Sequence, residues 1–245
     1  MELVVQGLIG AIRLIVTADR EVLRITTLTL RVSLVATGLA LVVGIPLGAW
    51  MALFDFPGRR LAIGWINAMM GLPPVVVGLW VSIMLWRYGP LGFLHLMFTP
   101  SAIVIAQFII CTPVATGVTM AGVQQVNPKL LEQLVSLGAT RKQLLWLVLR
   151  ESRMSVVAAA IAGFGRAVSE VGASMMVGGN IMGYTRVLTT AISMEVSRGE
   201  FQMALALSFI LLALSYGASL GLTILQQGRK RNGRVSKSRE SNVLL

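Results

Sequence analysis

Long apolar segments separated by short polar stretches make up most of the chain. A helix needs about 20 mostly apolar residues to cross a bilayer, and a helix is the only open-chain structure that satisfies its own backbone there. Segments of this kind lie at 27–53, 61–86, 100–123, 153–177 and 202–226. The pattern therefore predicts an all-α fold, a bundle of five membrane-spanning helices.

The two ends of the chain have a different pattern. In residues 2–18 the polar side chains fall near one side of a helix, which is typical of an amphipathic helix in the membrane interface. A short sixth span remains the alternative. We expect 1–20 to be this N-terminal helix, 21–227 a single membrane domain, and 228–245, rich in Lys, Arg and Ser, a disordered basic tail.

The polar segment 124–152, between the third and fourth spans, carries helix signals of its own. Asn127 can cap a helix that begins at Pro128, and Gly138 stands where a glycine would end that helix. Thr140 can cap the next helix. The leucines between these signals repeat at helical spacing. Such a stripe is buried against lipid, against its own bundle, or in a groove of a partner, and periodicity alone favours the first two.

Composition excludes several classes of protein. Hydrophobic residues make up 56% of the chain, charged residues only 13%, and mean hydropathy is +0.79. Soluble domains carry about 25% charged residues, so this is a polytopic membrane protein. Cys111 is the single cysteine, which excludes a disulfide scaffold.

The net charge of +11 sets the expected orientation. In a soluble chain it would suggest nucleic acid, but membrane proteins concentrate Lys and Arg on cytoplasmic loops. Segments 54–60, 124–152 and the tail after 227 hold twelve such residues, against six on the opposite side. We therefore expect the N-terminus outside, the C-terminus in the cytoplasm, lipid as the surroundings and no nucleic-acid partner.

Signals for catalysis are absent from the sequence. It contains no Walker-type G-x-x-x-x-G-K-[ST] motif, so we expect no ATP binding by this chain. His95 and Cys111 have no neighbours at metal-ligand or nucleophile–base spacing. We expect no catalytic residue, no metal and no cofactor, which disfavours an integral-membrane enzyme.

Two charges lie inside the fourth apolar segment. Arg166 and Glu170 are four residues apart and would share one face of a helix. Charges within a bilayer usually face a bundle interior or a wet cavity. We expect an ion pair within the helix, which is compatible with a place near a transport path.

A run of small and hydroxyl-bearing residues follows this segment. Gly178, Gly179 and Asn180 can leave a helix and expose backbone N–H groups. Neutral donors can replace the hydration of an anion without holding it too tightly. Four hydroxyls add to this donor set: Thr185, Thr189, Thr190 and Ser193. The alternative is a glycine-rich turn whose hydroxyls bond to the backbone.

The segment 124–152 resembles the coupling-helix signature of binding-protein-dependent ABC transporter permeases. In that signature an E-A-A triplet is followed after three residues by G. Here the triplet reads Glu132-Gln133-Leu134 and the glycine is Gly138.

Further runs are similar to one group of these permeases. Residues 29–33, 44–48 and 71–78 resemble molybdate, tungstate and sulfate permeases, and S-E-x-G-A at 169–173 resembles molybdate permeases. The long run 177–192 resembles tungstate permeases.

The resemblance implies a type I ABC importer permease (MetI-like) in the inner membrane that passes an oxyanion, tungstate, with molybdate or sulfate as alternatives. It implies a homodimer, two ATPase subunits that bind the ATP, and an extracytoplasmic oxyanion-binding protein. An ion-driven secondary carrier is the competing class. The implied ATPase contacts are Leu130, Glu132, Leu134, Leu137, Gly138 and Ala139. The implied path or gate residues are Arg166, Ser169, Glu170, Gly178, Gly179, Asn180, Thr185, Thr189 and Thr190.

Overall fold

The computed structural model describes residues 2–17 and 19–241, and every regular element within those ranges is a helix. The elements are α1 (Glu2–Val16), α2 (Arg20–Leu53), α3 (Arg59–Met70), α4 (Pro74–Leu85), η1 (Gly92–Leu94), α5 (Pro100–Gln124), α6 (Pro128–Ser136), α7 (Arg141–Glu151), α8 (Arg153–Val168), α9 (Gly172–Gly178), α10 (Leu188–Ser197) and α11 (Phe201–Ser241). The predicted all-α class is confirmed.

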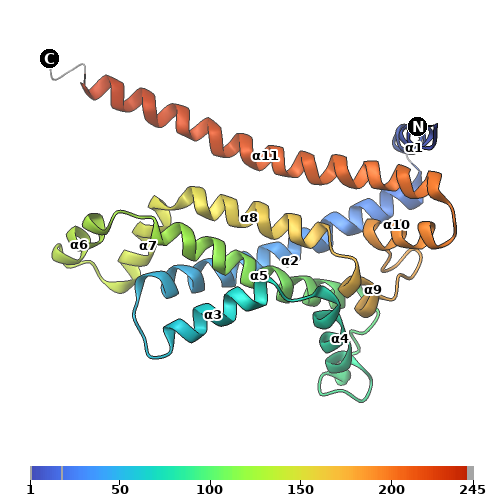
Figure 1. Ribbon diagram of the computed structural model, residues 1–245, viewed down its shortest axis with the longest axis horizontal. Helices are drawn as coiled ribbons and strands as arrows, with labels where there is room; N and C mark the ends of the chain where they lie inside the picture. The colour runs from blue at the N-terminus through green and yellow to red at the C-terminus, as the bar shows by residue number, and fades with distance from the viewer. Residues whose placement is uncertain (1, 18, 242–245) are drawn as a thin grey trace.

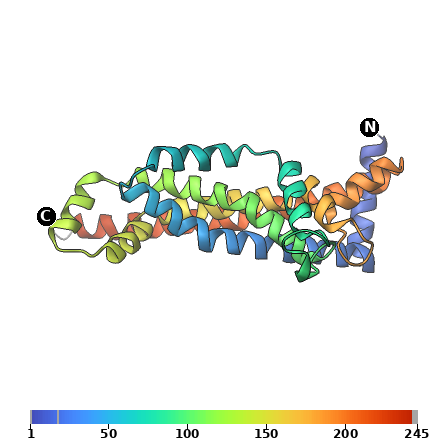
Figure 2. The same ribbon diagram turned by 90° about the horizontal axis from the view of Figure 1, so that it is seen from below.

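Long helices set the axis of the molecule. Helices α2, α5, α8 and α11 run along its longest dimension (Figure 1). Helix α1 lies across this direction at one end (Figure 2), where it packs against α11. Gln202 Nε2 donates to Gln6 Oε1 at 2.6 Å between these two helices. The short helices α6 and α7 lie at the opposite end of the molecule.

Three single helices and two bent pairs of helices match the five predicted apolar segments, so the bundle has up to five spans if each pair crosses the membrane once. Helices α3 and α4 meet at 99°, and α8 and α9 meet at 59°. The first break falls at Pro73 and Pro74, which have no backbone N–H and cannot continue a helix from the preceding turn. Helices α2, α5 and the stretch Phe201–Gly221 of α11 are each long and apolar enough to cross a membrane alone.

The centre of the bundle is the contact of α2 with α5 and α8. Gly44 and Gly48 of α2 let the backbones of α2 and α5 approach each other. A Cβ at Gly44 would lie 2.8 Å from the Ala115 Cβ, and a Cβ at Gly48 would overlap the Thr116 carbonyl oxygen. Small residues at helix contacts are the usual solution in membranes, where no hydrophobic force drives helices together.

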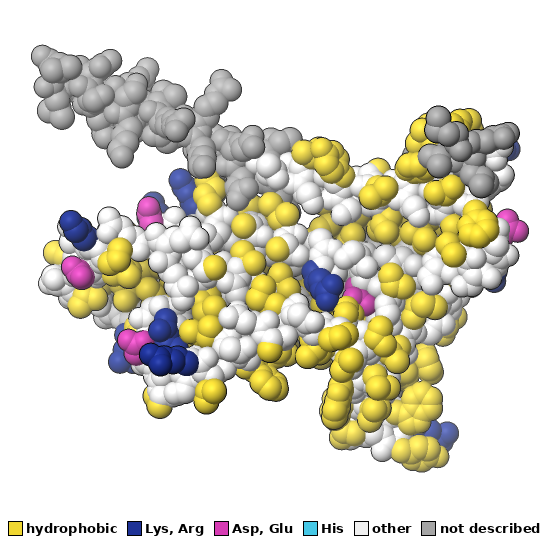
Figure 3. All heavy atoms as spheres, in the orientation of Figure 1, with side chains coloured by type: hydrophobic (Ala, Val, Ile, Leu, Met, Phe, Trp, Pro, Cys, Tyr) yellow, Lys and Arg dark blue, Asp and Glu magenta, His cyan; other side chains and the backbone are white. Residues whose placement is uncertain are grey.

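Helix α4 projects sideways from the bundle, and its outer surface is apolar (Figure 3). Val75, Leu79, Trp80 and Ile83 are exposed there. An apolar surface of this extent fits lipid or protein surroundings rather than water. Charged side chains gather mainly toward the two ends of the molecule in the same view.

The basic tail differs from the expectation of disorder. Helix α11 continues through this segment to Ser241. The stretch 228–241 contains no proline, and extending an existing helix avoids the unfavourable nucleation step. Residues 242–245 lie outside the described residues.

Candidate functional site

The segment between α5 and α7 begins as its caps predict. The Asn127 side chain accepts a hydrogen bond from the Lys129 N–H at 3.0 Å, and Pro128 is the first residue of α6. At the other side of the turn, Thr140 and Gln143 form a reciprocal capping box at the start of α7. The predicted helix starts are confirmed.

The turn between these helices depends on Gly138. Its φ of +77° is in the left-handed region, which glycine adopts without a steric cost. The N–H groups of Gly138 and Ala139 donate to the carbonyls of Val135 and Leu134, each at 3.0 Å, so the last carbonyls of α6 are satisfied. The helix, the sharp turn and the second helix therefore lie at one end of the bundle. We call residues 128–140 the coupling turn, after the role that the sequence resemblance implies.

The leucine stripe of α6 is divided between two surroundings. Leu130, Leu131 and Leu134 are half-buried and pack on the protein's own core. That core cluster contains Ala49, Val123, Val126, Leu144 and Val148. Leu137 is 84% exposed and Val135 is 60% exposed, and Glu132 is exposed beside them. The outward face of the coupling turn thus carries two unburied apolar side chains.

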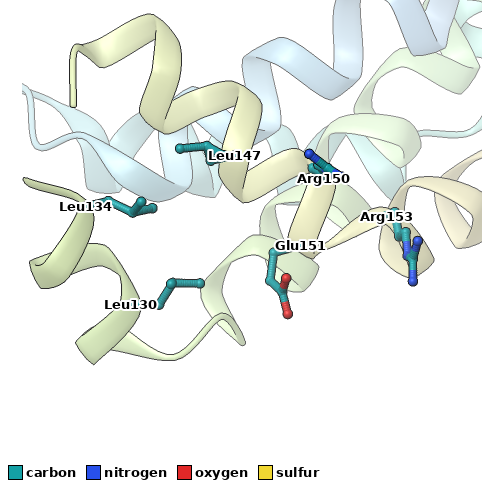
Figure 4. Close-up of a pocket in the computed structure, with 6 residues that line it drawn as sticks. All are labelled: Leu130, Leu134, Leu147, Arg150, Glu151 and Arg153. Atoms are coloured by element: carbon teal, nitrogen blue, oxygen red, sulfur yellow. The ribbon is translucent and has the colours of Figure 1, made fainter. Parts of the chain in front are cut away.

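A cavity of about 410 Å³ lies between α6 and the junction of α7 with α8 (Figure 4). Leu134 of α6 and Leu147 of α7 face each other across it. Its remaining lining residues are Leu130, Arg150, Glu151 and Arg153. One side of α6 therefore borders a cavity whose far wall carries charged side chains.

Glu170 occupies the break between α8 and α9. Its Oε1 accepts from the Ala173 N–H at 2.9 Å, which caps the start of α9. Its backbone carbonyl accepts from Thr189 Oγ1 at 2.8 Å. The predicted ion pair with Arg166 is wrong: both residues are described, and no salt bridge joins them. Helix α8 ends at Val168, so the geometry of residues four apart on one helix does not reach Glu170.

The other charged and polar positions at this break are less enclosed. Arg166 is half-buried, and Ser169 is exposed. The Ser169 Oγ donates to the Gly165 carbonyl of its own helix at 2.8 Å. These two residues therefore line the open side of the break while Glu170, only 4% exposed, is inside it.

The glycine run after α9 forms a tight turn. Helix α9 ends at Gly178, and Gly179 and Asn180 both have positive φ, +69° and +49°. Thr185 Oγ1 closes the turn: it donates to the Gly178 carbonyl at 2.6 Å and accepts from the Ile181 N–H at 2.9 Å. We call residues 178–190 the gate segment, after the role that the sequence resemblance implies.

The threonine hydroxyls of the gate segment are bonded to backbone. Thr189 bonds to Glu170, and Thr190 Oγ1 donates to the Val187 carbonyl at 3.0 Å. Thr185, Thr189 and Thr190 are 1%, 5% and 1% exposed. In this conformation the hydroxyls therefore hold the shape of the segment, and their hydrogens are not free for an anion.

Removing one of these hydroxyls has a predictable cost. Thr185→Val keeps the side-chain shape but leaves the Gly178 carbonyl and the Ile181 N–H without their partner. We expect a loss of about 1–3 kcal/mol in the free energy of unfolding, measured as a lower thermal midpoint of the purified protein in detergent. Thr185→Ser keeps the hydroxyl and is the matched control. Equal midpoints for the two variants would contradict the role of this hydroxyl.

Contacts that the sequence did not reveal tie the gate segment to α2. The Leu188 N–H donates to Thr29 Oγ1 at 2.9 Å, and Arg186 pairs with Glu21 at 3.2 Å. These partners are more than 150 residues apart in the chain, so no local pattern could reveal them. The sequence analysis also did not single out Gln107, whose amide is buried in α5. A polar residue inside an apolar span is the signal that could have identified it.

The two regions lie far apart in the molecule. The structure brings Glu170, Thr189, Gly178 and Thr185 together around the α8–α9 break, and it places the coupling turn at the other end of the long helices (Figure 1). Any coupling between them must therefore pass along the bundle.

The helical bundle with a helix–turn–helix at one end is similar in fold to a solved chain of a transporter. The chain has a TM-score of 0.71 to a chain of the MetNI methionine ABC transporter in inward-facing conformations, at 17% identity, covering 86% of this chain and 97% of that one. At 17% identity, this structural similarity shows a shared fold and does not by itself assign a function. The chain belongs to the family of binding-protein-dependent transport system inner membrane components, which matches residues 44–231.

Two relatives with curated descriptions are more similar to this chain in sequence. The tungstate uptake system permease protein TupB of Peptoclostridium acidaminophilum is 39% identical over 227 residues, covering 93% of this chain and 100% of the relative. A probable anion ABC transporter permease protein of Haloferax volcanii is 40% identical over 216 residues, which cover 86% of this chain and 93% of the relative. The protein is thus a multi-pass membrane component of an ABC importer, a family that implies ATPase and substrate-binding partners.

Proposed function

We propose that this protein is the permease subunit of a tungstate importer. It receives the oxyanion from an extracytoplasmic binding protein, and ATP hydrolysis in partner subunits drives transport. The observation that carries the proposal is the 39% identity to a tungstate permease along that relative's whole length. The alternatives within the class are molybdate and sulfate, which are also small tetrahedral dianions.

The coupling turn is proposed to dock on the ATPase subunits. Leu137, Val135 and Glu132 offer an exposed face with apolar and charged contacts, and an amphipathic helix set into a groove is a common mode of recognition. Leu130 and Leu134 hold α6 to its own bundle, so that a force on α6 reaches the long helices. Gly138 and Ala139 shape the turn between α6 and α7.

The gate segment and the α8–α9 break are proposed to border the path of the anion. Arg166 and Ser169 lie on the open side of the break, and Glu170 and the three threonines fix its shape from inside. The backbone N–H of Asn180 is a neutral donor of the kind that can replace hydration, whereas the N–H of Gly179 donates to the Met175 carbonyl at 2.9 Å in this conformation. Glu170 is not a contact for the substrate, because a carboxylate repels a dianion.

The proposed assembly is a homodimer in the inner membrane with two ATPase subunits. The coupling turn lies on the cytoplasmic side, where basic residues concentrate, and the N-terminus lies outside with α1 in the interface. ATP closes the partner subunits, the coupling turn moves, and the bundle opens outward to accept the anion. The chain itself is proposed to be non-catalytic and without a cofactor.

Uptake measurements test the substrate. In cells that carry the intact system, labelled tungstate uptake is expected to be saturable, to exceed the uptake of molybdate and sulfate, and to be lost when the permease gene is deleted. A variant of the partner ATPase that cannot hydrolyse ATP is the control for the energy source. Equal uptake of the three anions would contradict tungstate specificity, and uptake that persists without ATP hydrolysis would contradict the importer mechanism.

A further inference from the structure

Gln107 forms a buried link between two of the long helices. Its side chain lies in α5 and is 3% exposed. The Nε2 donates to the carbonyl of Ala167, in the last turn of α8, at 3.1 Å. The same carbonyl accepts from the Glu170 N–H at 3.2 Å. The amide of Gln107 therefore sits on the final turn of α8, directly before the α8–α9 break.

A second link lies one turn away. Cys111 Sγ donates to the Gly163 carbonyl at 3.3 Å. Positions 107 and 111 are one helical turn apart on α5, and positions 167 and 163 are one turn apart on α8. The links therefore run in matching register along two antiparallel helices. We call these two hydrogen bonds the α5–α8 clamp.

The clamped helices are the two that flank the coupling turn. Helix α5 leads into α6 after a short connection, and α7 leads into α8. The clamp lies toward the other end of α8, where that helix stops beside Glu170. Helices α5 and α8 thus extend from the coupling turn to the gate segment and are joined near the gate by side chains (Figure 1).

The chemistry of Gln107 is unfavourable for stability alone. Its Oε1 is buried and has no hydrogen-bond partner among the described residues. A buried polar atom without a partner is costly, and an apolar side chain of the same length would fill the space without that cost. A role beyond packing is the simplest reason for an amide at this position.

We propose that Gln107 is a positioning residue for transport. The α5–α8 clamp makes the two helices move as one body, so a displacement of the coupling turn reaches the α8–α9 break. The proposal rests on the importer mechanism above. It predicts that loss of either hydrogen bond of the clamp weakens the link between movement at the coupling turn and movement at the gate segment, and that loss of the Gln107 amide breaks this link.

The test uses single cysteines in the complete transporter, reconstituted with its ATPase subunits. Cys111→Ser removes the only native cysteine and keeps a donor for the Gly163 carbonyl. In that background Lys129→Cys reports on α6, and Met182→Cys, at an exposed position, reports on the gate segment. The rate of modification by a water-soluble maleimide is measured with and without ATP and vanadate. Both rates are expected to depend on nucleotide when Gln107 is present.

Gln107→Met is the decisive variant, because methionine is unbranched and apolar. We expect the nucleotide dependence to persist at Lys129→Cys and to be lost at Met182→Cys, with more ATP hydrolysed per anion transported. Thr116→Val is the matched control: this fully buried hydroxyl bonds to the Thr112 carbonyl of its own helix, so its loss breaks no link between helices. An unchanged response at Met182→Cys in Gln107→Met would overturn the proposal.

A second comparison covers the case in which Gln107→Met does not assemble. Cys111→Ala and Cys111→Ser are both free of cysteine, but only the serine variant keeps the donor. We expect a weaker nucleotide response at Met182→Cys with alanine, and an equal response would overturn the proposal. The maleimide readout needs no anion, so it stands even if tungstate is not the substrate. Absence of any nucleotide response with Gln107 intact would instead contradict the importer mechanism.

Discussion

Gly48→Val is expected to destabilise the folded protein strongly. A Cβ at this position would overlap the Thr116 carbonyl oxygen and lie 3.1 Å from the Met120 backbone nitrogen. Both atoms belong to the backbone of α5, so no rotamer change can relieve the contact and the helices have to separate. Overpacking in a core costs about 3 kcal/mol at the upper end of its usual range, a large share of a stability of about 5–15 kcal/mol.

Gly38→Val supplies the matched control for this prediction. Gly38 lies in the same helix, and nothing lies within 4 Å of a Cβ built there. The amount of monodisperse protein after detergent extraction, followed by its thermal midpoint, is the measurement. We expect near wild-type behaviour for Gly38→Val and aggregation or loss for Gly48→Val. Similar yields and midpoints would mean that α2 and α5 do not pack as described.

Hydropathy predicted five apolar segments, but three of them are single spanning helices and two are pairs of helices that meet at a bend. The apolar length of 61–86 and 153–177 is visible in the sequence, because crossing a bilayer sets a minimum number of apolar residues. Whether such a segment is straight depends on single residues. Pro73 and Pro74 are a visible cause of the 99° break. The 59° break at Glu170 has no proline, and there the Glu170 carbonyl accepts a hydrogen bond from Thr189, 19 residues further along the chain.

The coupling turn likewise has features that the sequence predicted and features that it did not. Local signals predicted the coupling turn well, because the caps at Asn127, Gly138 and Thr140 act within a few residues. The environment of each leucine was not predictable, since helical spacing fixes a face but not what covers it. Burial of Leu134 and exposure of Leu137 depend on where α7 and the core lie.

The break between α8 and α9 shows how a charge pattern can mislead. Arg166 and Glu170 have the spacing of an ion pair, but that reading requires the helix to continue through both. The helix stops two residues before Glu170, and the carboxylate caps the next helix instead. The gate segment that follows is held by residues far away in the sequence, such as Thr29. Such contacts are visible only in the folded structure.

Leu137→Glu is expected to disrupt binding of the ATPase subunits while the permease still folds. The side chain is 84% exposed, so it contributes little to the free energy of unfolding, and a charge there costs little in the isolated protein. In a docked groove the same charge would be buried without a partner. Loss of a central interface side chain costs about 2 kcal/mol or more, which corresponds to roughly 30-fold weaker binding.

Two comparisons make the interpretation of Leu137→Glu specific. Tyr88→Glu changes an equally exposed residue, 88% exposed, in the connection between α4 and η1, and we expect it to leave ATPase co-purification unchanged. Leu134→Glu instead places a charge in the half-buried part of the stripe, so it should lower the thermal midpoint as well as ATPase binding. If Leu137→Glu retains wild-type affinity in a binding titration, the exposed face of α6 is not the docking surface. The leucines of α6 would then serve only the packing of their own bundle.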